Sequence, residues 1–410
     1  MSRKTLALLL AMTLVVVACS SSKKSATSAT TGGSTATTAA PNHAVDVVAV
    51  LSTGAQGATG EQAQVALNGL KAAANVLNAQ GGILGRQVKI EVIDDAGNPT
   101  NGAGLLQQRL QSSPKPDVII PGSISTEGVA YVPIANGAAV MSIGTPSALT
   151  LIDPTKYPYN FSMPPSQVDI AQQMIQYVKD NAGKKVGVIS AQSAFGTSWA
   201  TAVKQAVTTL GVQAAYETYV DMTQLDMTAS LERLKATNPD FLLVQGFGAS
   251  VGYVLDSRVK LGWNIPTLCE STCGVTPLVT STLVGTPAEQ NFKIQVPLID
   301  VYSPNPTPGV TNYLNALKAL GPITGINTQY SFEYDALMVV AQAAKQANSL
   351  ATPALVKAME DLQQPSNPLW VTLAQYHWSS TSHAAQGSGK DYPMVVPTKL
   401  VDGQVGAPGA

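Results

Sequence analysis

Two short stretches of this 410-residue chain hold residues whose types and spacing could do chemistry. Gly248-Ala249-Ser250-Val251-Gly252 matches the G-x-S-x-G pattern of a nucleophile elbow, and it follows an apolar, strand-like run. His377 and His383 come later in the chain, in the order that a hydrolase needs. A secreted serine hydrolase using Ser250 is therefore one hypothesis. The run also fits a GxGxxxG nucleotide loop with Glu270 after the next strand, although a close-packed strand-to-helix turn explains both matches without chemistry.

The second stretch, "LCESTCG", places Glu270 between Cys269 and Cys273. Two cysteines without a nearby histidine are too few for a zinc site, so we expect no metal here. A disulfide that rigidifies the loop is the preferred alternative in an exported protein. Glu270 is either a solvated loop residue or a carboxylate in a cleft, where a cationic partner would offset its desolvation.

A third cysteine, Cys19, follows a segment typical of export. Arg3 and Lys4 form a positive n-region, and Thr5 to Val17 is an apolar run shorter than the roughly 20 residues that span a bilayer. Ala18 then supplies a small residue, so that the segment resembles the bacterial lipobox in which the cysteine is acylated. The alternative is an ordinary signal peptide that happens to end near a cysteine.

The lipobox interpretation divides the start of the chain into two parts. Residues 1–18 are expected to be a lipoprotein signal peptide, and residues 19–43 a disordered tether rich in Ser and Thr. A tether of this length has an end-to-end distance of roughly 25 Å, which holds the folded part just outside a membrane. Acylation of Cys19 also leaves an even pair of cysteines for an oxidising compartment.

Composition excludes several classes of partner. Charged residues make up 12% of the chain and the net charge is -1, without a basic stripe, so nucleic acid is not expected as a partner. We expect no cofactor. High Ala, Gly and Val with few aromatic residues suits an α/β protein with buried sheets, and the length suits two domains.

Apolar strands alternate with helical runs along the chain. The expected strands are Val45 to Ser52, Val88 to Asp94, Asp117 to Gly122, Ala138 to Gly144, Lys184 to Ser190, Asp240 to Gly246 and Ile265 to Ser271. The expected helices are Glu61 to Ala79, Gly102 to Gln111, Gln167 to Asn181, Thr197 to Leu210, Met227 to Lys235 and Ser250 to Leu261. This βαβα pattern predicts parallel sheets covered by helices on both faces.

The pattern restarts after Pro164-Pro165, which predicts two doubly wound parallel-sheet lobes joined by a hinge. We expect the first lobe to comprise residues 44–164 and 298–372, and the second lobe residues 165–297 and 373–410. Ligands bind at the carboxyl ends of the strands in such sheets, so the cleft between the lobes is the expected site.

The stretch "NVLNAQGGILGRQVKIEVIDDAGNP" resembles the bacterial leucine/isoleucine/valine-binding proteins, the type I periplasmic solute-binding proteins of ABC importers. The resemblance rests on the turn at Asn78, Gly81, Gly82 and Ile83 and on the acidic pair that begins at Asp94. It implies a binding protein and not an enzyme, and it implies closure of two lobes over a solute. Its partners would be that small solute and a membrane permease.

The resemblance also implies ligand contacts in the first lobe. Ser123 corresponds to a serine that binds the ligand carboxylate, and the strand-to-helix turn around it could form an anion site. Gly144 and Thr145 correspond to groups that hold the ligand ammonium, and Thr59 stands where the family often has an aromatic lid residue. Ser125 and Thr126, next to this turn, are equally explained as helix caps.

In the second lobe the resemblance points to three residues. Phe195 and Phe247 occupy aromatic positions but lack the tyrosine hydroxyl, and plain core packing is the alternative for both. Glu270 aligns with the family's carboxylate for the ligand ammonium.

The sequence thus predicts an extracytoplasmic, lipid-anchored, monomeric substrate-binding protein of an ABC importer, with a branched-chain or related amino acid as the expected ligand. Other amino acids, amides and small carboxylates stay open. A ligand-sensing module without a permease is the second alternative to this function, beside the hydrolase.

Overall fold

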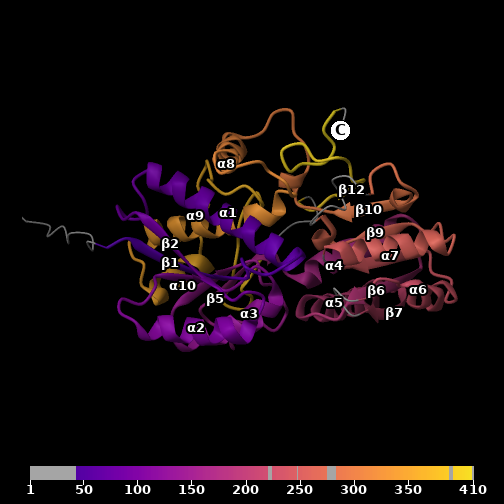
Figure 1. Ribbon diagram of the computed structural model, residues 1–410, viewed down its shortest axis with the longest axis horizontal. Helices are drawn as coiled ribbons and strands as arrows, with labels where there is room; N and C mark the ends of the chain where they lie inside the picture. The colour runs from indigo at the N-terminus through magenta and orange to yellow at the C-terminus, as the bar shows by residue number, and fades with distance from the viewer. Residues whose placement is uncertain (1–42, 220–223, 247, 275–282, 387–390, 409–410) are drawn as a thin grey trace, which may run out of the picture. The chain divides into compact units, whose positions relative to one another are not determined.

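The computed structural model describes residues 43–219, 224–246, 248–274, 283–386 and 391–408. These residues form two six-stranded sheets, each covered by helices (Figure 1). We call each sheet with its helices a lobe, and the α/β fold class predicted from the sequence is confirmed.

The sheet of the first lobe is parallel throughout, in the order β11-β5-β4-β3-β1-β2. Its strands are β1 (Val45–Leu51), β2 (Val88–Asp94), β3 (Val118–Ile120), β4 (Met141–Gly144), β5 (Asn160–Pro165) and β11 (Ala384–Ala385). Buried residues alternate along β1: Val47 and Ala49 enter one core, while Val48 and Val50 enter the core on the opposite face. This period of two is what a strand buried on both faces requires.

Helices cover both faces of this sheet. α2 (Pro99–Gln111) and α3 (Ser125–Gly137) lie on one face, opposite α1 (Ala58–Ala79) and α9 (Thr328–Ala347) (Figure 1). α8 (Pro308–Lys318) and α10 (Thr352–Glu360) pack on the same side as α1 and α9. α1 and α9 approach closely at Gly69, where a Cβ atom would come within 2.0 Å of the Tyr330 carbonyl oxygen.

The turn that carried the family resemblance has a clear physical basis. Asn78, in the last turn of α1, bonds the backbone of Val88 in both directions, with Nδ2 3.0 Å from the carbonyl oxygen and Oδ1 2.7 Å from the amide nitrogen. Gly82 has φ +82° and packs against the Arg86 carbonyl, so no side chain fits there. The asparagine therefore fixes where β2 begins.

The sheet of the second lobe has the order β12-β10-β9-β8-β6-β7, parallel except for β12. Its strands are β6 (Lys185–Ala191), β7 (Gln213–Tyr219), β8 (Phe241–Gln245), β9 (Thr267–Cys269), β10 (Phe292–Gln295) and β12 (Met394–Val395). Its helices within the described residues are α4 (Gln167–Asp180), α5 (Ala194–Leu210), α6 (Thr228–Lys235) and α7 (Ala249–Lys260). α4 and α5 share one core with the sheet, and α6 and α7 pack on the other.

The chain passes between the sheets after β5, after β10 and after β11. The last passage corrects one expected boundary, which put all of residues 373–410 in the second lobe. β11 pairs with β5, and Tyr376 and Trp378 lie in the first lobe's core, where their rings stack at 5.3 Å. Trp378 also packs edge-on against Phe161 of β5, and this buried aromatic surface holds the segment in the first lobe.

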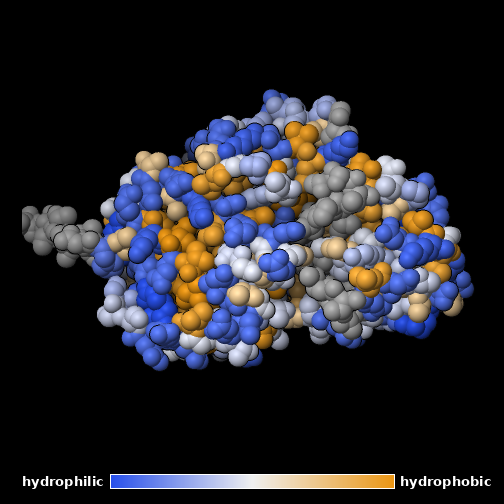
Figure 2. All heavy atoms as spheres, viewed as in Figure 1, coloured by the Kyte–Doolittle hydropathy of each residue, from blue (hydrophilic) through white to orange (hydrophobic). Residues whose placement is uncertain are grey.

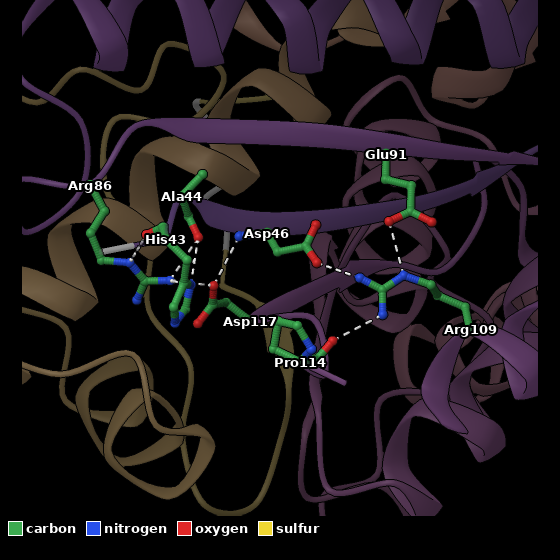
Figure 3. Close-up of polar contacts among 8 residues, drawn as sticks. All are labelled: His43, Ala44, Asp46, Arg86, Glu91, Arg109, Pro114 and Asp117. Atoms are coloured by element: carbon green, nitrogen blue, oxygen red, sulfur yellow. Dashed lines mark hydrogen bonds and ion pairs between the residues drawn. The ribbon is translucent and has the colours of Figure 1, made fainter. Parts of the chain in front are cut away.

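At its amino edge the first sheet is fastened by two arginines (Figure 3). Arg86 donates from Nε to the His43 carbonyl at 2.9 Å and from Nη2 to the Ala44 carbonyl at 2.8 Å, and it pairs with Asp117 at 2.8 Å. Arg109 makes ion pairs with Asp46 and Glu91. Arg86 thereby ties down the first described residues of the chain.

Hydrophilic residues cover much of the face seen in Figure 2, with hydrophobic residues in smaller patches. No helix among the described residues is long and apolar enough to cross a membrane. Cys19 and the expected tether lie outside the described residues, apart from His43.

Candidate functional site

A cavity of about 150 Å³ lies where strands of both sheets end, and both lobes contribute to its wall. The first lobe supplies Thr59, Gln62, Ser123, Ile124, Ser125, Thr126, Thr145, Ser147, Pro164, Thr328, Gln329 and Phe332. The second lobe supplies Gln167, Ile170, Ser193, Phe195, Gln245, Ser271 and Thr272. Hydroxyl and amide groups thus alternate with aliphatic and aromatic surface, in a space suited to a small solute.

The first wall is built around the start of α3. Glu127, in the first turn, turns back so that its Oε2 accepts the backbone N–H of Ser123 at 2.6 Å and that of Ile124 at 3.4 Å. Ser125 faces the cavity, and its Oγ accepts the N–H groups of Ser147 and Ala148, both at 3.1 Å. Ser125 therefore braces the neighbouring loop, while Glu127 caps the helix.

Two buried carboxyl groups, those of Asp95 and Glu127, lie behind this wall. Ser52 Oγ is 2.5 Å from Asp95 Oδ1 and 2.6 Å from Glu127 Oε1, and one hydroxyl can donate to only one of them. Asp95 also accepts from the Tyr131 hydroxyl and the Gly97 N–H. Burial raises the pKa of Glu127 to about 7, although the bond from Ser52 opposes the shift. Folding therefore favours the protonated form of Glu127 relative to the unfolded chain.

A second buried carboxyl group supports the next loop. Thr145 donates to Glu333 Oε1 from its hydroxyl at 2.7 Å and from its backbone N–H at 3.2 Å. Gly144 does not line the cavity, and a Cβ there would come within 3.4 Å of Glu333 Oε1. Burial raises the pKa of Glu333 to about 7, against the effect of the bonds from Thr145. Its Oε2 has no hydrogen-bond partner among the described residues.

The second wall begins at α5 and β8. Ser193 caps α5 by accepting the Gly196 N–H at 3.0 Å, and this places Phe195 at the cavity. Phe195 also packs against the core beneath α4 and α5, so the ring serves both the wall and the packing. Gln245, at the end of β8, accepts the Ala191 N–H at 3.2 Å and lines the cavity as well.

Glu270 lies behind the second wall and does not line the cavity. A short 3-10 turn, Ser271–Gly274, brings Ser271 and Thr272 to the wall and leaves Glu270 0% exposed. The Thr272 N–H donates to Glu270 Oε2 at 3.0 Å, and the hydroxyls of Thr272 and Ser271 donate as well. Burial raises the pKa of Glu270 to about 7, while the bonds from Thr272 oppose the shift. The alternative of a solvated loop residue is wrong.

The two cysteines on either side of Glu270 are joined by a disulfide in the structure. Cys269 and Cys273 are both fully buried, and their Cα atoms are 5.9 Å apart. The bridge closes the turn that holds Glu270.

Of the residues expected from the sequence, the structure brings Thr59, Ser123, Thr145 and Phe195 together at the cavity. Gly144 and Glu270 lie one layer behind, and Phe247 is outside the described residues. Sequence reasoning missed Gln62 and Gln329, whose side chains bond each other at 2.7 Å across 267 positions. It also missed Gln167, Ile170 and Phe332, and no short motif marks any of them.

The hydrolase hypothesis is wrong. Ser250 is 3% exposed in α7 of the second lobe, whereas His383 is buried in the first lobe and stacks on Phe161 at 4.0 Å. His377, at the surface, contacts Gln375. In the part of the chain that the structure describes, no group of His, Cys, Asp and Glu could hold a metal ion.

Comparison with known proteins decides the family. A family model described as periplasmic binding protein matches residues 47–387. The chain belongs to the periplasmic binding protein family. Members of this family are extracytoplasmic solute-binding proteins and not enzymes.

Two curated relatives of this periplasmic binding protein carry leucine/isoleucine/valine names. It is 31% identical over 219 residues to "Leu/Ile/Val-binding protein homolog 3" of Brucella melitensis, covering 51% of this chain and 55% of the relative. It is 26% identical over 201 residues to "Leu/Ile/Val-binding protein BraC3" of Rhizobium johnstonii, covering 48% and 52%. The chain therefore matches only about half the length of these relatives.

Solved structures share the fold over nearly the whole chain. An extracellular ligand-binding receptor from Rhodopseudomonas palustris HaA2 has a TM-score of 0.73 at 17% identity, covering 88% of this chain and 99% of that one. LivJ from Streptococcus pneumoniae, in complex with isoleucine, has 0.69 at 18%, covering 89% and 98%. A fatty acid ABC transporter substrate-binding protein from Thermomonospora curvata has 0.68 at 15%, covering 87% and 92%. At these identities the likeness shows the fold alone.

Proposed function

We propose that this periplasmic binding protein is the solute-capturing component of an ABC importer and is held at the cell membrane by a lipid on Cys19. The observation that carries the proposal is the cavity, because both lobes line it at the ends of their strands. A solute that contacts both walls favours the closed arrangement over an open one. A permease would then recognise the closed protein.

Amino acids are the first probes to try, because the curated relatives are named as leucine/isoleucine/valine-binding proteins. The cavity volume suits a solute of that size, and Ile170, Phe195 and Phe332 offer surface for a branched or aromatic side chain. Thr145 and Ser123 offer hydroxyl groups from the first lobe. We propose these residues as ligand contacts.

The test has two parts. The mature protein should bind a small solute at one-to-one stoichiometry in calorimetric titration, and pull-down from membranes should recover ABC permease subunits. Binding without any permease would favour a sensing module instead. A protein that binds no solute, and purifies with none, would refute the proposed function.

A further inference from the structure

The cavity wall offers no counter-charge to a charged ligand. Among the described residues every side chain in the wall is uncharged, and the hydrogen-bonding groups are hydroxyls and amides. Phe247 and residues 275–282, which follow β8 and β9 in the sequence, contain no ionisable side chain either. Enclosing an ionised group without a partner is costly, so such a wall disfavours an ionised solute.

The place where a ligand carboxylate would be held is already occupied. The start of α3 is the natural anion site of the first lobe, since backbone N–H groups point outward there. Glu127 fills it with a carboxyl group of the chain itself, bonded to the N–H groups of Ser123 and Ile124. A second carboxyl group brought to this loop would have to compete with Glu127 for the same donors.

The carboxyl groups that could hold a ligand ammonium do not line the cavity either. Glu270 is fully buried, and Thr272 and Ser271 satisfy its oxygens from the side that faces the cavity. Glu333 is also fully buried, with Thr145 between it and the cavity. Neither carboxyl group lines the wall.

One acceptor at the wall is left without a donor. Gln167 lies between the lobes and lines the cavity, and its Nε2 donates to the Ser147 carbonyl at 3.2 Å. Its Oε1 is buried and has no hydrogen-bond partner within the described chain. A ligand N–H group that reached this oxygen would satisfy it.

We propose that the solute is uncharged, with an amide-like polar end and an apolar remainder, and is not an α-amino acid. Its N–H group bonds Gln167, its carbonyl accepts from hydroxyls of the wall such as Ser123, and its apolar part packs against Phe195 and Phe332. This inference rests on the proposed function and narrows its ligand class.

Four probes with one branched carbon skeleton separate the charge states. They are 4-methylpentanamide (uncharged), 4-methylpentanoate (anion), L-leucinamide (cation) and L-leucine (zwitterion). In calorimetric titration of the mature protein at neutral pH, the uncharged amide should bind at least about tenfold more tightly than each charged probe. Tighter binding of any charged probe would overturn the inference and leave the proposed function standing.

Three variants sharpen the test. Gln167→Glu keeps the shape of the side chain and adds a carboxylate, so the affinity for L-leucinamide should rise relative to that for 4-methylpentanamide by about tenfold. Glu270→Gln should leave the affinity for 4-methylpentanamide within about twofold. If Gln167→Glu kept the parent's preference for 4-methylpentanamide over L-leucinamide, the inference would be contradicted. It would also be contradicted if the parent bound leucine and either Glu270→Gln or Glu333→Gln abolished that binding.

If no probe binds, native mass spectrometry of the purified protein decides. A co-purified uncharged solute supports the inference. A co-purified ionised solute overturns the inference but leaves the proposed function standing. The absence of any solute in both experiments counts against the proposed function, and the inference then fails with it.

Discussion

Glu127→Gln should make the protein more stable at neutral and alkaline pH. The folded state raises the pKa of Glu127 from 4.5 to about 7, so folding favours the protonated carboxyl group. The protein therefore loses stability as the pH rises from about 4.5 to about 7, because ionising the buried group costs free energy that the unfolded chain does not pay. At about 1.4 kcal/mol per pKa unit, the loss is somewhat more than about 3 kcal/mol by pH 8.

Glutamine reproduces the protonated form at this position. Its carbonyl can accept the Ser123 N–H, and its NH2 group can donate to Ser52 Oγ, which lies 2.6 Å from Glu127 Oε1. Urea unfolding at several pH values should give a higher free energy of unfolding for Glu127→Gln than for the parent. This difference should grow from pH 5 to pH 8. Glu232→Gln, at an exposed position on α6, is the matched control. A difference in the free energy of unfolding that does not change with pH would contradict the raised pKa of Glu127.

Three other predictions test the anchor, the disulfide and the arginine at the amino edge. Cys19→Ala should release the protein into the medium or leave an uncleaved precursor in fractionation, and unchanged processing would sink the lipoprotein interpretation. Intact mass should rise by two hydrogens when Cys269 and Cys273 are reduced; free thiols at both positions would disprove the bridge. Arg86→Ala should lower the free energy of unfolding by about 3 kcal/mol because its ion pair is buried. Arg233→Ala removes an arginine whose side chain is 59% exposed in its ion pair, and it should lower the free energy of unfolding by less than about 1 kcal/mol. Equal losses in the two variants would argue against a stabilising role for the buried Arg86 ion pair.

Much of the fold was predictable because strands and helices buried on one or two faces leave periodic patterns. β1, β2 and α1 follow such patterns closely. β5 was missed because its sequence, NFSMPP, ends in two prolines, which normally argue against a strand. α9 was missed because it is buried along most of its length and so shows no polar face.

Part of the candidate site was predictable because some of its residues follow closely after the end of a strand. Ser123 and Thr145 are such residues, and both reach the cavity. Glu270 also ends a strand, but its direction depends on the turn at Ser271–Gly274, and no sequence pattern states that its side chain bonds back to Thr272. Gln329 reaches the site from a helix of the first lobe far along the chain, and only the folded structure brings it to Gln62.

The central claim is that the cavity between the lobes holds the solute. Thr59 lines that cavity as the second residue of α1, and Thr100 is exposed as the second residue of α2, so the two positions form a matched pair. Native mass spectrometry should find one bound solute on the parent protein and on Thr100→Trp, and none on Thr59→Trp, whose indole fills the cavity. A solute retained by Thr59→Trp, with thermal unfolding unchanged in both variants, would contradict the account.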